Sequence, residues 1–133
     1  MDAFATGRFD VTLAPQPLAD PAAPATLGRR TIDKQFQGDL EAQSRGEMLS
    51  AGGSEAGSAG YVAIEQVTGT LQGRHGSFVL QHSGMLNRGT PELAISVVPD
   101  TGTDELRGLS GRMAIEIGPG GEHTYRFDYT LPD

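Results

Sequence analysis

The stretch that decides the fold is residues 61–86, YVAIEQVTGTLQGRHGSFVLQHSGML. Residues 61–71 and 77–85 within it are rich in apolar and β-forming side chains, and the QGRHG segment between them contains two glycines. Glycine readily adopts the positive φ that tight turns between antiparallel strands require. The stretch is therefore predicted to be a long β-hairpin.

Similar patterns occur on both sides of the hairpin, and no segment has the periodicity of a good amphipathic helix. Apolar and polar residues alternate in several of these segments, which is typical of half-buried strands. Residues 92–99 are apolar on both parities, so we expect that strand to be covered on both faces. The predicted strands are residues 5–14, 27–37, 38–50, 61–71, 77–85, 92–99, 106–117 and 123–131.

About eight strands separated by turn signals predict an all-β antiparallel barrel or sandwich. We favour a single antiparallel β-barrel of about eight strands, because long strands with internal glycines can curl until no edge is exposed. Gly108 and Gly111 interrupt the seventh predicted strand. Glycines at such positions are typical of the bends that close barrels.

Composition limits the possible functions. The 133 residues suit one domain, 1–133, in which residues 15–26 form a loop rich in proline and alanine. The net charge of −7 argues against nucleic-acid and membrane partners, because phosphate groups and anionic lipids are repelled by an acidic surface. The chain has no cysteine, no signal-peptide pattern at its start and no apolar run long enough to span a bilayer. We therefore expect a cytoplasmic location.

Three segments, taken in order, carry a resemblance to a known family. They are the hairpin of residues 61–86, VVPDTGTDELRGLSG at residues 97–111, and HTYRFDY at residues 123–129. With them the chain resembles a bacterial family of unknown function, DUF3224, over residues 9–129. The resemblance implies a barrel with an interior cavity, like that of allene oxide cyclase, and it implies no particular activity. The family's Ser-Gly-Thr-Gly-Glu-Leu turn has Asp104 here in place of its second glycine, so a slightly different turn is expected.

Two polar side chains of the hairpin are the candidate catalytic residues. Glu65 shares its parity with Tyr61, Ala63 and Val67, and His82 shares its parity with Phe78 and Leu80. If these parities face inward, a carboxyl and an imidazole enter an apolar lumen. A carboxyl there is expected to have a raised pKa and to act as an acid or base. The alternative, which we favour, is that Glu65 pairs with an arginine such as Arg112 or Arg126 and that His82 is a satisfied core histidine.

The third predicted strand has a face that is small in its middle, where Ser44 and Gly46 lie between Ala42 and Met48. Such a face either packs against bulky neighbours or leaves room for a ligand. We favour packing.

No metal site and no cofactor are expected. His75 and His82 lie in one hairpin but on opposite parities, so they face opposite sides of the sheet. The chain has neither cysteine nor a closely spaced histidine pair.

Three functions remain open. The first is a binding module for a small hydrophobic ligand, whose lumen is lined by Phe9 and Met113 among others. The second is a cyclase-type or isomerase-type enzyme that moves a proton through Glu65 or His82. The third is a structural homo-oligomer with a filled barrel, and homo-oligomerisation is expected in general. The candidate ligand-binding residues are Phe36, Met48, Glu65, Phe78, His82 and Tyr125.

Overall fold

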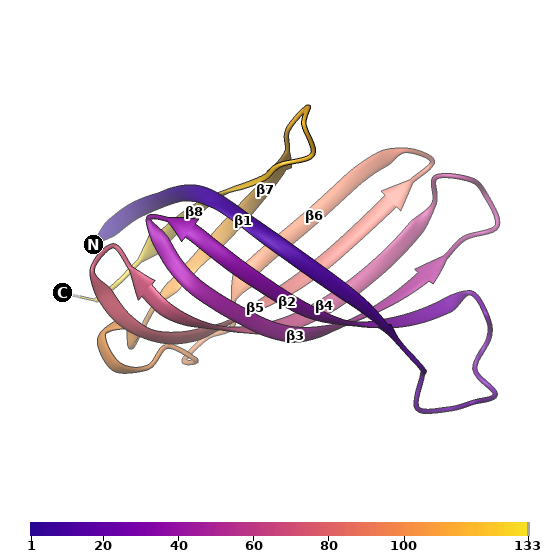
Figure 1. The fold of residues 1–133 in the computed structure, drawn as a ribbon, viewed down its shortest axis with the longest axis horizontal. Helices are drawn as coiled ribbons and strands as arrows, with labels where there is room; N and C mark the ends of the chain where they lie inside the picture. The colour runs from indigo at the N-terminus through magenta and orange to yellow at the C-terminus, as the bar shows by residue number, and fades with distance from the viewer. Residues whose placement is uncertain (133) are drawn as a thin grey trace.

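The computed structural model describes residues 1–132 as a closed antiparallel β-barrel (Figure 1). Each strand pairs with its neighbours in sequence, and β8 returns to pair with β1. The predicted all-β barrel of eight strands is therefore confirmed. Its elements are β1 (Asp2–Gln16), β2 (Leu27–Gly38), β3 (Leu40–Gly52), β4 (Ala59–Leu71), β5 (Arg74–Asn87), β6 (Thr90–Val97), the 3₁₀ turn η1 (Asp104–Leu106), β7 (Ser110–Ile117) and β8 (His123–Thr130).

The central hairpin is tighter than expected. Its turn consists of Gln72 and Gly73 alone, with φ of 45° and 86°. Positive φ at both turn residues is the geometry that matches the twist of the flanking strands. Arg74, His75 and Gly76, which were expected to belong to a longer connector, are therefore part of the β4–β5 ladder, which runs from the Ala59–Leu86 pair to the Leu71–Arg74 pair.

Two of the strand predictions need correction. Residues 106–109 are not strand: η1 ends at Leu106, and β7 begins only at Ser110. The first five residues of β6, Thr90–Ala94, are exposed instead of being covered on both faces. They are exposed because β7 does not pair with them, and Ser96–Arg112 is the one pair recorded between the two strands among the described residues.

One end of the barrel is filled with apolar side chains. Leu106 of η1 is 1% exposed, and it closes this end together with other buried residues of the core. Phe78 stacks on Phe127 with ring centroids 5.7 Å apart. The residues that fill this end include Leu40, Leu71, Phe78, Leu109, Phe127, Tyr129 and Leu131.

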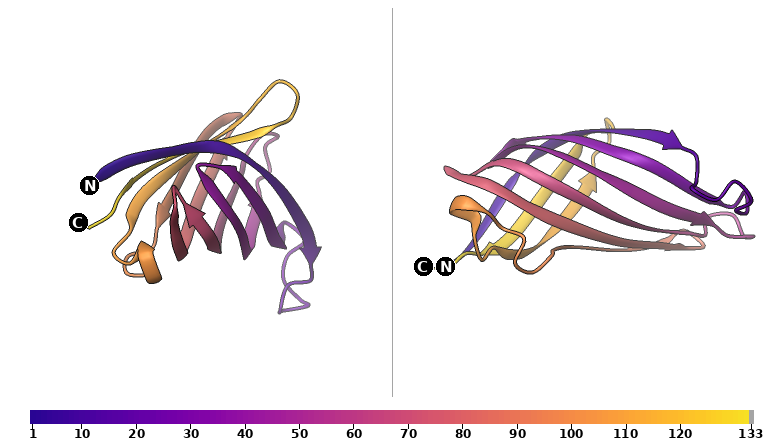
Figure 2. Two further views of the ribbon diagram at one scale, coloured as in Figure 1. Left: turned by 60° about the vertical axis from the view of Figure 1, so that its left-hand side comes forward. Right: turned by 90° about the horizontal axis from the view of Figure 1, so that it is seen from below.

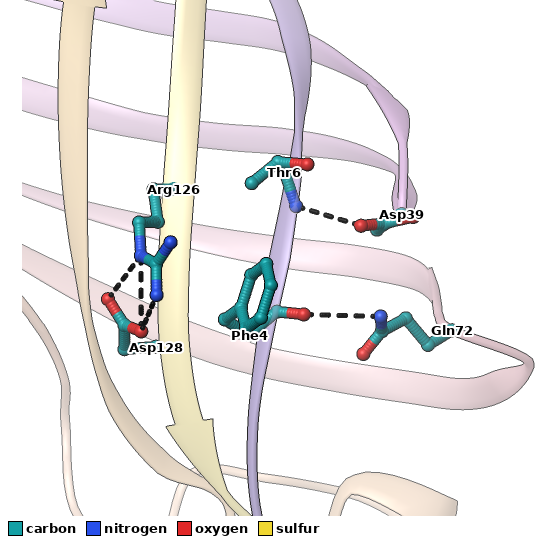
Figure 3. A network of polar contacts seen from close by, with 6 residues as sticks. All are labelled: Phe4, Thr6, Asp39, Gln72, Arg126 and Asp128. Carbon is teal, nitrogen blue, oxygen red and sulfur yellow. Dashed lines mark hydrogen bonds and ion pairs between the residues drawn. The ribbon is translucent and has the colours of Figure 1, made fainter.

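Polar contacts fasten the turns at this closed end to β1 (Figure 3). The Thr6 amide donates to Asp39 Oδ2 at 2.9 Å, and the Gln72 side-chain amide donates to the Phe4 carbonyl at 3.2 Å. Arg126 lies over the Phe4 ring. The β2–β3 and β4–β5 turns are thus held against the first strand.

The opposite end of the barrel is open. It carries the loop of residues 17–26 and the connections β3–β4, β5–β6 and β7–β8. Figure 2 shows the two hairpins β5–β6 and β7–β8 extending in different directions at this end. The open end is therefore where a molecule could reach the interior.

Candidate functional site

A cluster of polar side chains lies inside the barrel, between the filled end and the open end. Lys34, Glu65 and His82 are 5%, 0% and 4% exposed. Lys34 Nζ lies 2.9 Å from Glu65 Oε2, and His82 Nε2 lies 3.3 Å from the same oxygen. The cluster is therefore a buried ion pair with an imidazole on its other side.

The sheet register explains why these three side chains meet. Lys34 is on β2, Glu65 on β4 and His82 on β5, and all three are on inward parities. Between Lys34 and Glu65 lies the small face of β3, where Ser44 pairs with Lys34 and Gly46 pairs with Glu65. Ser44 is small where it pairs with Lys34, and Gly46 allows β3 to approach β4 closely, because a Cβ there would lie on the Ile64 carbonyl oxygen. The favoured prediction, packing against a bulky neighbour, describes this part of β3.

The Lys34 side chain also packs against aromatic rings. Its Nζ lies 5.1 Å from the ring centroid of Phe9 and 5.8 Å from that of Phe36. An ammonium group near the face of an aromatic ring is attracted by the negative charge density of that face. These rings therefore stabilise the buried cation in addition to Glu65.

The Glu65 carboxylate is ionised. Burial alone would raise its pKa, but the contact with His82 and the positive charge of Lys34 outweigh burial and hold the pKa below its ordinary value. The predicted raised pKa is therefore wrong, because the sequence reading did not include Lys34 as a partner. An ionised carboxylate held in this way has no proton to donate at neutral pH.

The contacts inside the cluster are short but poorly aligned. Both oxygens of Glu65, His82 Nε2 and Ser44 Oγ are buried without a hydrogen bond of good geometry in the described structure. Buried polar atoms normally have such partners, and those that lack them are often at functional positions. The cluster thus keeps unused hydrogen-bonding capacity inside the barrel.

Tyr61 connects the cluster to the open end. Its hydroxyl lies 3.5 Å from His82 Nδ1, and the two rings are tilted at 6.3 Å. Burial, and next the charge of Glu65, raise the pKa of Tyr61, so the hydroxyl keeps its proton at neutral pH. An alanine at position 84 would place its Cβ on the Tyr61 ring, so Gly84 is what allows the ring to lie against β5.

A cavity of about 380 Å³ lies at the open end, beside Tyr61. Its wall is mostly apolar, and Arg30 and Glu92 contribute charge to it. Most of the lining residues have the inward parity of their strands, so the cavity is the open mouth of the barrel. The lining also includes Met48, Ser50, Tyr61, Gly84, Leu86, Pro91 and Leu93.

The structure brings some of the predicted site residues together and separates others. Glu65 and His82 are in contact, and Met48 lines the cavity. Phe36 lies next to the cluster, where it packs edge-on against Tyr125. Phe78 lies in the filled end instead.

Tyr125 has a structural contact that explains its burial. Its hydroxyl accepts a hydrogen bond from the Leu40 amide at 2.9 Å and donates to the Gln37 carbonyl at 3.0 Å. Burial raises the pKa of this tyrosine. Both hydrogen bonds join β8 to the β2–β3 turn, away from the cavity.

Lys34 is the residue that sequence reasoning missed. It shares its parity with Ile32 and Phe36 in β2, and that parity was the signal that could have identified it. The arginines suggested as partners of Glu65 are elsewhere. Arg126 pairs with Asp128 on the outer surface, and Arg112 is exposed.

Within residues 1–132, no three histidine, cysteine or acidic side chains are grouped so that they could hold a metal ion. The same residues include no helix with the length and apolar character needed to cross a membrane.

The chain is thus a small antiparallel barrel with a filled end, an open end and a buried ion pair between them. Residues 5–129 match the model of a family described as protein of unknown function, DUF3224, so the chain belongs to this family. A crystal structure of a DUF3224 protein of unknown function from Shewanella oneidensis MR-1 is 49% identical, with a TM-score of 0.92. The match covers 100% of this chain and 99% of that chain. No curated protein matches the chain significantly.

Proposed function

We propose that the protein binds a small, mostly apolar molecule in the cavity at the open end of the barrel. The observation that carries this proposal is the apolar cavity of about 380 Å³ whose wall includes Tyr61. Its volume lies near the lower end of the range of about 300–1,000 Å³ that is usual for ligand pockets. The mostly apolar wall favours a compact apolar ligand over a charged one.

Tyr61 is the residue that would orient the ligand. Its side chain lines the cavity, and its part-buried hydroxyl lies 3.5 Å from His82 Nδ1, which is long enough for the contact to be replaced by a ligand atom. Glu65 is fully buried and paired with Lys34, so it acts on a ligand only through His82 and Tyr61. A ligand with one polar atom on an apolar body fits this arrangement.

A fluorescence titration with N-phenyl-1-naphthylamine, a neutral apolar dye, tests this proposal. Met48→Trp fills the cavity from β3 and is expected to weaken dye binding at least tenfold. Gln35→Lys, on the outer face of β2, is the control and should leave binding unchanged. Equal binding by the native protein and the Met48→Trp variant would refute the cavity as the site.

A second function is favoured by the row of groups that leads away from the cavity. Tyr61 Oη contacts His82 Nδ1, and His82 Nε2 contacts Glu65 Oε2. A tyrosine backed by an imidazole and a carboxylate can donate a hydrogen bond or a proton to a ligand oxygen. We infer from this an alternative role in proton transfer of the isomerase or cyclase type, with Tyr61 in contact with the ligand.

Exchange of the α-protons of cyclohexanone in D₂O, followed by NMR, tests this alternative: Tyr61 would donate to the ketone oxygen while a solvent base removes the α-proton, and deuterium from D₂O replaces it. The native protein should accelerate exchange over buffer, and Tyr61→Phe and Glu65→Gln should each remove the acceleration. Native protein that leaves exchange at the buffer rate would argue for binding alone.

The cellular setting is part of the same proposal. A chain without cysteine and with a net charge of −7 fits the reducing, crowded cytoplasm of a bacterium. The likeness to allene oxide cyclase stays a prediction from the sequence.

A further inference from the structure

The outer face of β4 and β5 has no charged residue. The outward side chains of β4 include Val62 and Ile64, which are 53% and 49% exposed, followed by Gln66 and Thr68. On β5, Met85 is 66% exposed and Val79 is half-buried, and the other outward residues are polar. Between Ala59 and Asn87 the two charged side chains, Glu65 and Arg74, have inward parities.

The rest of the outer surface is different. The outward positions of β2 and β3 carry charged residues such as Asp33 and Arg45, and those of β8 carry Arg126 and Asp128. Charged residues make up 20% of the chain. Loss of charge from one face, with apolar residues exposed on it, is the compositional signal of the core of a protein interface.

The uncharged face is also hollowed. Leu18 of the loop of residues 17–26 lines two adjoining hollows together with Leu49 and Val62, and the larger hollow has a volume of about 820 Å³. Arg29 holds this loop in place, because it donates to the Pro17 carbonyl at 3.0 Å and pairs with Glu47 at 2.5 Å. The ion pair neutralises Arg29 and Glu47, which leaves Asp20 as the one unpaired charge among the residues that line this hollow.

The face is large enough for a stable contact. β4 and β5 have 13 and 14 residues. With the adjoining edges of β3 and β6 they present a strip about 40 Å long and about 14 Å wide, or about 600 Å² of sheet. A standard protein–protein interface buries about 800 Å² on each partner, and the loop beside the strip adds further surface.

We propose that this outer face of β4 and β5 is the interface of a homodimer, in which two copies of the chain bury their uncharged faces against each other. Each copy carries a net charge of −7, so two copies repel each other at most orientations. The face of β4 and β5 adds no charge to that repulsion, and its apolar side chains gain from burial. A charged partner would find no opposite charge there to recognise.

Sedimentation velocity and light scattering of the purified protein test the proposal. The native protein is expected at about 28 kDa, twice the 14.0 kDa of one chain. Higher NaCl should strengthen the dimer, because salt screens the repulsion between two acidic copies and leaves apolar burial intact. A native protein that is monomeric from 1 to 100 µM would overturn the proposal without any variant.

Ile64→Lys locates the interface. The substitution lowers the negative charge of each copy, so weaker association cannot come from greater repulsion. The variant should dissociate at least a hundredfold more readily while keeping the native circular dichroism spectrum. Ile117→Lys is the matched control, since Ile117 is 70% exposed at the end of β7 and the charge change is the same. A dimer that survives Ile64→Lys, or one that Ile117→Lys disrupts equally, would place the interface elsewhere.

Discussion

Replacement of Lys34 by methionine separates the charge of the buried cluster from its packing. Methionine keeps an unbranched apolar chain over Phe9 and Phe36 and removes the ammonium group that lies 2.9 Å from Glu65 Oε2. The carboxylate is then left fully buried with only His82 beside it. Breaking a buried ion pair by removing one partner costs about 3–5 kcal/mol. That is a large part of the roughly 5–15 kcal/mol by which a domain is stable.

The stability that is lost on Lys34→Met depends on pH, and the structure predicts the direction of that dependence. In the native protein, burial raises the pKa of Glu65, but His82 and Lys34 together hold it below its ordinary value of 4.5. The ion pair therefore contributes stability that is fully present above pH 4.5 and is lost as the pH falls through the lower folded pKa. Without Lys34, burial is opposed by His82 alone, so the pKa rises and Glu65 protonates at a higher pH. The difference in unfolding free energy between native and variant should thus be largest at pH 7 and should shrink toward pH 4.

Urea unfolding followed by circular dichroism at the two pH values measures this difference. Arg29→Met is the matched control, because Arg29 and Glu47 form an ion pair whose side chains are 32% and 57% exposed. Exposed pairs contribute about 0–1 kcal/mol, so Arg29→Met should lower the free energy of unfolding by no more than about that amount. The double variant Lys34→Met/Glu65→Leu removes both buried charges and should recover most of the loss. A cost below about 1 kcal/mol for Lys34→Met at pH 7, or a cost that is equal at pH 4, would refute this account of the cluster.

Three other substitutions test the frame around the site. Gly46→Ala would place a Cβ on the Ile64 carbonyl oxygen, so it should lower the unfolding free energy in urea by about 1–3 kcal/mol or more. Tyr125→Phe removes the hydroxyl that bonds to the Leu40 amide and the Gln37 carbonyl, and it should cost about 1–3 kcal/mol without changing dye binding. Asp104→Gly should raise the melting temperature, because Asp104 has φ of 53° and a left-handed backbone costs a non-glycine residue about 1–2 kcal/mol. A lower melting temperature for that variant would mean that the aspartate side chain stabilises the turn by more than its backbone strain.

The strands could be predicted because the barrel has one dry face and one wet face. In β4, for example, the parity shared by Tyr61, Ala63, Glu65 and Val67 is the inward one. Because successive side chains of a strand point to opposite faces, such alternation shows from the sequence alone which side of the strand faces the core. The exposure of residues 90–94 could not be predicted in the same way, because it depends on β7 not pairing with this part of β6.

The site could be predicted only in part. Parity placed Glu65 and His82 inside the barrel, but it could not show how far along the barrel they lie from the filled end. The partner of Glu65 comes from β2, two strands away, across the small residue Ser44 of β3. Lys34 was passed over because lysine is rarely buried unless it is paired. Its partner becomes visible only when the strands are aligned in register.

The closure of the barrel is very uneven. Each of the other neighbouring strand pairs shares eight to thirteen residue pairs, whereas Ser96–Arg112 is the one pair recorded between β6 and β7 in residues 1–132. The hairpins β5–β6 and β7–β8 can therefore separate at the open end while every long ladder stays intact. Such an opening exposes little new surface and needs no global unfolding. The backbone amides along the facing edges of β6 and β7 should thus exchange with solvent early.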